Sequence, residues 1–380
     1  MATITKVKKA DGTTRYRVRV VVGHRPDGTA IQQMRTYATK RESESEGAKW
    51  EADVARGTAG NGARMLLGAY LAEWLERSAR RVRPITLYGY RYLVDHYITP
   101  TSMAGVPLGK LTPAVVQRWI DHMPHPATAR KARTILGIAL GEAERLGLVA
   151  RSPVPRTTAP AHTPKVGTAW SVEETRRFLP VAAKDSYSPF WHLAAYLGLR
   201  PSEVIGLRWD AVDLDAGSLR VERARPTACG KMFDADTTKS PSGKRTLALT
   251  PALVLRLRIH RTAQKEQRMA MGDRWREHGL VCTTQVGTPL EQRALSRHFD
   301  QLCTAAGVSR IRVYDLRHTA TSVMIDAGAD LKAASEALGH SDPGITMRVY
   351  RHVRADQRDH AIGALAAALD TPTPEVSDTP

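Results

Sequence analysis

The sequence predicts a multidomain α+β protein: an N-terminal three-stranded sheet plus one helix, a four-helix bundle, and a mixed, mainly α-helical domain with a small β-hairpin sheet. Three observations lead to this prediction. The chain has 380 residues, which is more than one ordinary domain holds. Apolar residues change from alternation to helical spacing near Lys40. Breaks rich in glycine, proline or threonine divide the chain into these segments: 1–57, 64–150, a linker at 151–167, 168–369 and a disordered tail at 370–380.

The first segment combines strand signals with one helix. Residues 14–22 alternate and are rich in β-branched side chains, and residues 31–37 continue the strand pattern after a turn. Helix-forming residues follow at 40–55. Alternation places three arginines of the first strand on one face, which is either a solvated surface or a surface that lies against DNA. These candidate DNA contacts are Arg15, Arg17 and Arg19.

The second segment shows apolar residues at helical spacing in four stretches, with proline at two first-turn positions. These stretches are residues 65–79, 85–98, 113–123 and 127–146. The following residues, 151–167, contain four prolines among basic side chains, a composition that we expect cannot form a helix and stays extended as a basic linker.

Composition excludes several classes of protein. The net charge is +18 and is spread along the chain, which favours a polyanionic partner, although ribosomal and membrane-surface proteins can be equally basic. No apolar run has transmembrane length and the first residues lack a secretory signal, so we expect a cytoplasmic protein without a membrane partner. The cysteines are odd in number and lack metal-ligand spacing, which argues against disulfides and structural zinc.

Residues suited to phosphate chemistry recur at predicted helix boundaries in the C-terminal half. Arg200 lies between the end of one helix and the start of the next, and Glu203, one turn later, is placed to support it. Arg317 lies in the first turn of another helix, where the helix N-terminus also attracts phosphate. A further short helix ends at His340, and Tyr350 follows ten residues later.

These residue types fit attack by a phenol on a phosphodiester. Two guanidinium groups, Arg200 and Arg317, can stabilise the charge that develops on the nonbridging oxygens, so neither a metal nor a cofactor is required. A phenol with an ordinary pKa of about 10 is a weak nucleophile until it is held in line with phosphorus in a positive field. Tyr350 supplies that phenol.

Four motifs resemble the catalytic boxes of the tyrosine recombinases, the family that includes phage integrases. They are GLRPSE at 198–203, YDLRHT at 314–319, LGH at 338–340 and Tyr350, in the family's order and spacing. The resemblance covers the C-terminal half well, and 1–57 and 64–150 resemble the arm-type and core-binding DNA-binding domains more weakly. It implies a site-specific recombinase that cleaves and rejoins double-stranded DNA through a 3′-phosphotyrosine intermediate, to integrate or excise a mobile element. It also implies a homo-tetramer on paired sites, with an excision factor or a host DNA-bending protein as further candidate partners.

The resemblance also implies roles for further residues. A lysine on a β-hairpin protonates the leaving 5′ oxygen, and Lys239 fits best, with Lys231 and Lys244 as nearby competitors. His340 is expected to donate a hydrogen bond to phosphate. The box around Arg317 usually begins with histidine, whereas this chain has Tyr314, whose phenol can donate to phosphate but is a poor base at neutral pH.

Other interpretations remain open at the level of sequence. Residues 317–340 also resemble a helix-turn-helix, which favours a noncatalytic DNA-binding regulator, but a regulator needs neither the arginine pair nor Tyr350. A type IB topoisomerase shares the tyrosine chemistry without choosing partners, and the three-part organisation favours an integrase instead. A predicted apolar helix face at 361–369 either docks on a neighbouring subunit or packs within its own domain.

Overall fold

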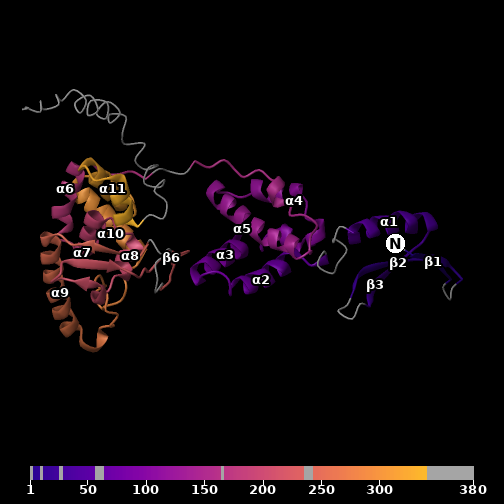
Figure 1. The fold of residues 1–380 in the computed structure, drawn as a ribbon, viewed down its shortest axis with the longest axis horizontal. Helices are drawn as coiled ribbons and strands as arrows, with labels where there is room; N and C mark the ends of the chain where they lie inside the picture. Colours follow the sequence, from indigo (N-terminus) through magenta and orange to yellow (C-terminus); the bar gives the residue numbers. More distant parts are fainter. Residues whose placement is uncertain are drawn as a thin grey trace, which may run out of the picture. The chain divides into compact units, whose positions relative to one another are not determined.

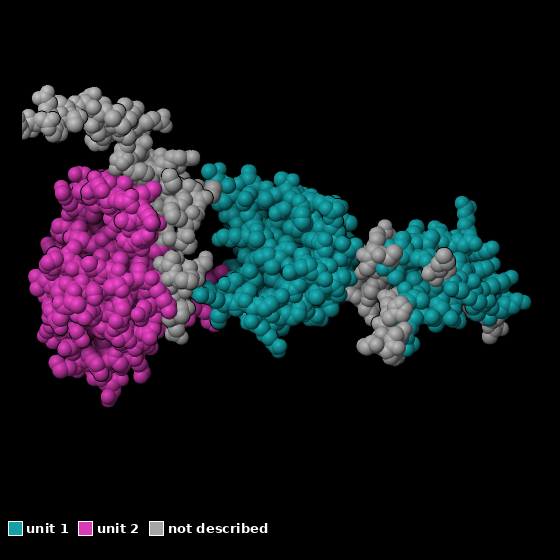
Figure 2. All heavy atoms as spheres, viewed as in Figure 1, with its two compact units in different colours: residues 1–164 teal, residues 165–380 magenta. Residues whose placement is uncertain are grey.

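The structure is a computed structural model that divides into two compact units, 1–164 and 165–380, each described here by itself (Figure 2). The described residues are 3–8, 12–24, 29–55, 64–163, 167–234 and 243–339. Within them, every helix is too short or too polar to cross a membrane.

The start of unit 1 is the predicted three-stranded sheet with one helix on one face (Figure 1). The strands are antiparallel in the order β1-β2-β3, and α1 follows β3. Val18 and Val20 of β2 are buried with Trp50 of α1, and the alternate residues Arg17 and Arg19 are exposed. The element bounds are β1 (Thr3–Lys8), β2 (Thr14–His24), β3 (Ala30–Tyr37) and α1 (Lys40–Ala55).

The rest of unit 1 contains the four predicted helices. Trp74 and Leu136 lie in their shared core, where the buried Tyr70 hydroxyl donates to the carbonyl of Ala139 at 2.7 Å. Thr112 caps one helix through the backbone N–H of Val115. The helices are α2 (Leu67–Ser78), α3 (Pro84–Tyr97), α4 (Pro113–Asp121) and α5 (Pro126–Arg145), with short 3-10 turns η2 (Ser102–Gly105) and η3 (Leu108–Lys110).

The beginning of the predicted linker is not extended. Val154–Arg156 forms a 3-10 turn, η4, and the Val154 side chain is buried in the core of the helices. Arg133 of α5 fixes this turn by donating to the carbonyls of Val154 at 2.9 Å and Thr157 at 2.8 Å. The prediction of an extended chain is therefore wrong here, because proline is compatible with a first helical turn and an apolar side chain gains by burial.

In unit 2, helices and two small sheets pack around an aromatic core. Trp170, Phe178, Trp191 and Phe299 pack together, and α11 packs against α7 (Figure 1). The sheets have the orders β4-β5-β8 and β6-β7. Strand bounds are β4 (Val212–Asp213), β5 (Ser218–Val221), β6 (Thr227–Ala228), β7 (Lys231–Met232) and β8 (Arg245–Ala248). Helix bounds are α6 (Val172–Ala182), α7 (Ser188–Leu197), α8 (Pro201–Gly206), α9 (Pro251–Met271), α10 (Gln292–Ala306), α11 (Asp315–Asp326) and α12 (Leu331–Leu338), with 3-10 turns η5 (Trp209–Ala211) and η7 (Gly272–Arg274).

Candidate active site

The junction between α7 and α8 fixes the position of Arg200. Gly198 ends α7 with a left-handed φ of 60°, and a Cβ there would lie 2.4 Å from Cδ2 of Leu338, so glycine avoids both backbone strain and a shift of Leu338. Pro201 begins α8, and Arg200 is the extended residue before it. The Arg200 backbone N–H donates to Glu203 Oε2 at 3.0 Å, and the Arg200 side chain donates from Nη1 to Glu203 Oε1 at 2.6 Å. Local chain geometry therefore joins the arginine to the carboxylate one turn later.

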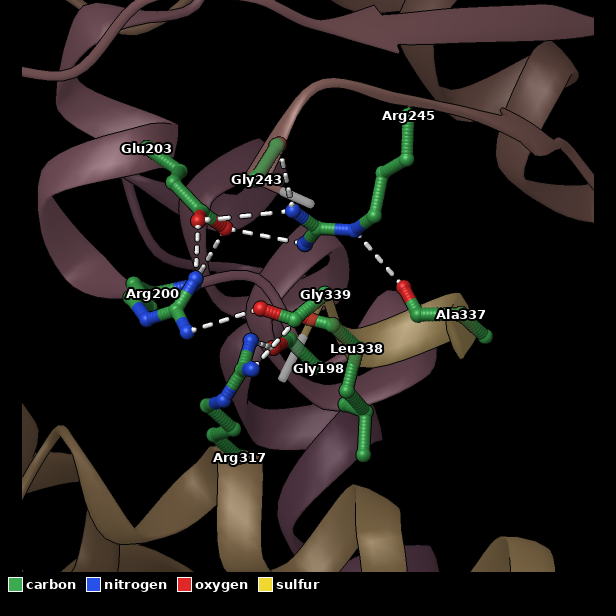
Figure 3. Close-up of polar contacts among 9 residues, drawn as sticks. All are labelled: Gly198, Arg200, Glu203, Gly243, Arg245, Arg317, Ala337, Leu338 and Gly339. Atoms are coloured by element: carbon green, nitrogen blue, oxygen red, sulfur yellow. Dashed lines mark hydrogen bonds and ion pairs between the residues drawn. The ribbon is translucent and has the colours of Figure 1, made fainter. Parts of the chain in front are cut away.

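Glu203 is a buried carboxylate between two guanidinium groups (Figure 3). Besides Arg200, it accepts from Nη2 of Arg245 at 2.9 Å. Burial raises the pKa of Glu203, but the hydrogen bonds and charges of Arg245 and Arg200 outweigh that effect, and the pKa lies below its ordinary value. The carboxylate is therefore ionised at neutral pH and can hold both cations.

Arg317 enters the same region from the first turn of α11. Its residue exposure is 1%, and its Nη1 donates to the carbonyl of Gly198 at 2.8 Å while Nη2 donates to the carbonyl of Leu338. Burial, and next the charge of Arg200, lower the pKa of Arg317 to about 9. The guanidinium still carries its proton at neutral pH.

Three arginines meet at the C-terminal end of α12 (Figure 3). Arg245 Nε donates to the carbonyl of Ala337 at 2.7 Å, Arg317 donates to that of Leu338, and Arg200 Nη2 donates to that of Gly339 at 3.2 Å. The last carbonyls of a helix lack intrahelical partners and carry partial negative charge, so they attract cations. Among the described residues, these three arginines share the single carboxylate of Glu203, so the cluster has an excess of positive charge, which suits an anionic phosphodiester.

Tyr314 and His318 lie at the start of α11. Tyr314 is 43% exposed, and its ring contacts the His318 ring edge-on with centroids 5.7 Å apart. Burial lowers the pKa of His318, the Asp315 carboxylate opposes that shift, and the charges of Arg312 and Arg317 add to it. His318 is therefore mainly neutral at pH 7. Tyr314 presents the more accessible side chain.

The other predicted site residues do not belong to the described part of this cluster. Lys239, His340 and Tyr350 lie outside the described residues. The three N-terminal arginines lie on β2 of unit 1: Arg15, Arg17 and Arg19. Among the described residues, no group of three or more histidine, cysteine or acidic side chains is arranged to hold a metal ion.

Sequence reasoning missed Arg245. Its partner Glu203 lies 42 residues earlier, and only tertiary folding brings them together. One signal was present in the strand, because Arg245, Leu247 and Leu249 alternate on one side and the two leucines are buried. A charged residue in line with buried apolar ones needs a buried partner of opposite charge.

Comparisons with known proteins agree with the folded architecture. The model of the phage integrase family matches residues 177–357, and that of the phage integrase N-terminal SAM-like domain matches residues 66–123. The solved Tn1549 transposon integrase in complex with transposon right end DNA has a TM-score of 0.64 at 16% identity, covering 80% of this chain and all of that one. A lambda integrase tetramer bound to a Holliday junction gives 0.56 at 16% identity, with 90% and 94% covered. At these identities the likeness shows a shared fold.

Sequence relatives extend over most of the chain. A tyrosine recombinase XerC-like protein of Caldanaerobacter subterraneus subsp. tengcongensis is 25% identical over 93% of this chain and 96% of its own. A protein of Mycobacterium tuberculosis named as a prophage phiRv2 integrase is 30% identical over 80% of this chain and 78% of its own. With this identity and coverage added to the matched motifs and fold, the chain belongs to the phage integrase family, as a tyrosine-type site-specific DNA recombinase.

Proposed function

We propose that the protein cleaves and rejoins double-stranded DNA through a 3′-phosphotyrosine intermediate formed by Tyr350, to integrate or excise a mobile element. The observation that carries this proposal is the convergence of Arg200 and Arg317 on consecutive carbonyls at the end of α12. In the sequence, His340 comes two residues after the end of α12, and Tyr350 comes ten residues after His340. Transfer of a phosphoryl group to tyrosine requires positive charge around the phosphate, and the proposal brings Tyr350 to these arginines.

In the proposed reaction, the Tyr350 phenol gives its proton to solvent water and its oxygen attacks phosphorus. A bond forms between the phenolic oxygen and phosphorus, and the bond from phosphorus to the 5′ oxygen breaks. Lys239 gives a proton to that oxygen, and His340 donates a hydrogen bond to the phosphate. Attack by a 5′ hydroxyl on the phosphotyrosine reverses these changes and rejoins the strand. Arg200 and Arg317 stabilise the charge on the nonbridging oxygens during both steps.

The two arginines differ in access to phosphate. The Arg200 side chain is 30% exposed, so it can meet a phosphate from solvent. Arg317 is buried and donates to two carbonyls, so direct contact with phosphate requires a rearrangement when DNA binds. Even without contact, its charge contributes to the field around Arg200, because the interior screens charge weakly.

Each segment of the chain has its own role in this reaction. Residues 168–369 carry the chemistry, 64–150 bind the core of the DNA site, and 1–57 bind a separate arm-type site through Arg15, Arg17 and Arg19. Four copies act on two paired sites. The DNA complexes of the Tn1549 transposon integrase and the lambda integrase tetramer on a Holliday junction, which share this fold, support this assembly.

A covalent capture experiment tests the proposed chemistry. The full-length protein is incubated with a randomised library of nicked duplexes, and adducts that survive denaturation are recovered and sequenced. Wild-type protein should give adducts on a defined sequence, and Tyr350→Phe should give none. Tyr196→Phe is the matched control, because this exposed tyrosine of α7 can lose its hydroxyl without loss of the adduct. Adducts that persist in Tyr350→Phe, or their absence from the wild type, would contradict the proposal.

A further inference from the structure

Arg245 is a buried guanidinium with partners on three parts of unit 2. Its side chain is 7% exposed. It donates to Glu203 of α8 at 2.9 Å, to the carbonyl of Ala337 in α12 at 2.7 Å, and to the carbonyl of Gly243 at 3.2 Å (Figure 3). The Arg245 side chain therefore links α8, the last turn of α12 and the residues just before β8.

Stability alone is a poor explanation for such a residue. Removing a guanidinium from water costs several kcal/mol by general estimates, about as much as a buried ion pair returns, and apolar side chains often replace such pairs without loss. The neighbouring alternate strand residues, Leu247 and Leu249, are apolar and buried. A charged side chain in this row is best explained by the orientation it gives to its partners.

The contacts show which orientation is fixed. Arg245 donates to both oxygens of Glu203, from Nη2 to Oε2 at 2.9 Å and from Nη1 to Oε1 at 3.4 Å. Oε2 also accepts from the Arg200 backbone, and Oε1 accepts the one hydrogen bond from the Arg200 guanidinium, at 2.6 Å. Without Arg245, both carboxylate oxygens could turn to the Arg200 side chain and form the two-bond pair that arginine and carboxylate favour. That pair would draw Arg200 away from solvent.

We propose that Arg245 is a positioning residue for the DNA cleavage proposed above. It holds Glu203 so that Arg200 keeps one side of its guanidinium for phosphate, and it fixes the end of α12 where Arg200 and Arg317 also bind. The effect on the reaction passes through these partners, and Arg245 itself does not touch the DNA. The inference rests on the proposed function, because it concerns the rate of that reaction.

The test measures the rate of adduct formation in a single turnover on the nicked site recovered by covalent capture, together with the Kd for that site. Arg245→Lys keeps the charge but loses the planar fork, and we expect adduct formation to slow by about 10- to 100-fold, as small misplacements of reacting groups do. We expect the Kd to change by less than about threefold, because buried Arg245 gives no phosphate contact. The matched control is Arg258→Lys, which alters an exposed pair with Asp215 and should change neither quantity.

A double-mutant cycle separates positioning from general damage. If Arg245 acts through Glu203, the rate losses of Arg245→Lys and Glu203→Gln should not multiply when the two are combined. All rates are measured well below each variant's unfolding midpoint, so a slower rate does not reflect loss of folded protein. A rate within twofold of the wild type, a loss matched by weaker DNA binding, or losses that multiply would overturn the inference. The proposed function is tested separately by comparing adduct formation in the wild type and in Tyr350→Phe, and that comparison does not depend on the result for Arg245→Lys.

Discussion

The arginines of the N-terminal sheet and those at the end of α12 carry the same charge in opposite settings. Arg17 and Arg19 of β2 are exposed and form no ion pair within the part of the chain that the structure describes. Arg245 and Arg317 are buried. Arg245 donates to Glu203 and to the carbonyl of Ala337, and Arg317 donates to the carbonyls of Gly198 and Leu338. An exposed arginine attracts phosphate through a field that salt screens, whereas a buried one acts through fixed geometry and a charge that salt screens much less.

This contrast predicts that substitutions of buried and of exposed arginines affect different steps. Changes in the buried cluster should alter the rate of the chemical step with little effect on the salt dependence of binding. Changes on the sheet should alter binding and its salt dependence with little effect on stability or on the chemical step.

Arg317→Met should reduce the single-turnover rate of adduct formation by about 10²- to 10³-fold, the usual cost of removing one group that stabilises a developing charge. The unfolding midpoint should change little, because two effects oppose each other. The substitution removes hydrogen bonds to Gly198 and Leu338, but it also relieves a buried charge whose pKa is lowered by burial and by Arg200. Thermal unfolding and the adduct rate are measured on the same preparations. A collapse of the midpoint would show that Arg317 is needed mainly for folding.

The buried cluster also marks the limit of sequence reasoning. Arg200 and Arg317 could be predicted as candidates because local signals place them: Gly198 and Pro201 mark a helix end and a helix start, and Asp315 begins the next helix. Such signals act over a few residues, and the structure has helices at these positions. The alternation in residues 14–22 likewise predicted β2 and its exposed arginines.

Contacts between distant segments could not be predicted in the same way. The bond from Arg245 to Ala337 spans 92 residues, and it depends on how β8 and α12 pack against a common core. Likewise, Val154 lies in a proline-rich stretch, and its burial depends on a gap between helices that no local pattern reveals. Packing decides such contacts, and a single sequence does not record it.

Arg17→Ala combined with Arg19→Ala should weaken binding to arm-type DNA by several-fold. Each lost phosphate contact should reduce the slope of log K against log salt by about 0.9. Stability should change by less than about 0.5 kcal/mol per site, because both side chains are exposed and lack ion pairs in the described chain. Titrations at several salt concentrations measure the slope. Lys49→Ala on α1 is the control, because that lysine also lies at the surface but on the helix that covers the other face of the sheet. An unchanged affinity and slope would show that the arginine face is merely solvated.

Tyr314→His should have the smallest effect, because Tyr314 is neither a buried member of the arginine cluster nor one of the exposed arginines of the sheet. It is 43% exposed, and its ring packs edge-on against His318. Histidine keeps a hydrogen-bond donor for phosphate and adds a group with an ordinary pKa near 6.5, which is better suited than a phenol to accept a proton at neutral pH. The single-turnover rate should therefore stay the same or rise by a few-fold, with Tyr314→Phe as the control that lacks a donor. A loss greater than about tenfold in Tyr314→His would mean that the phenol itself is required, and the region at the start of α11 would then differ chemically from the family pattern that it resembles.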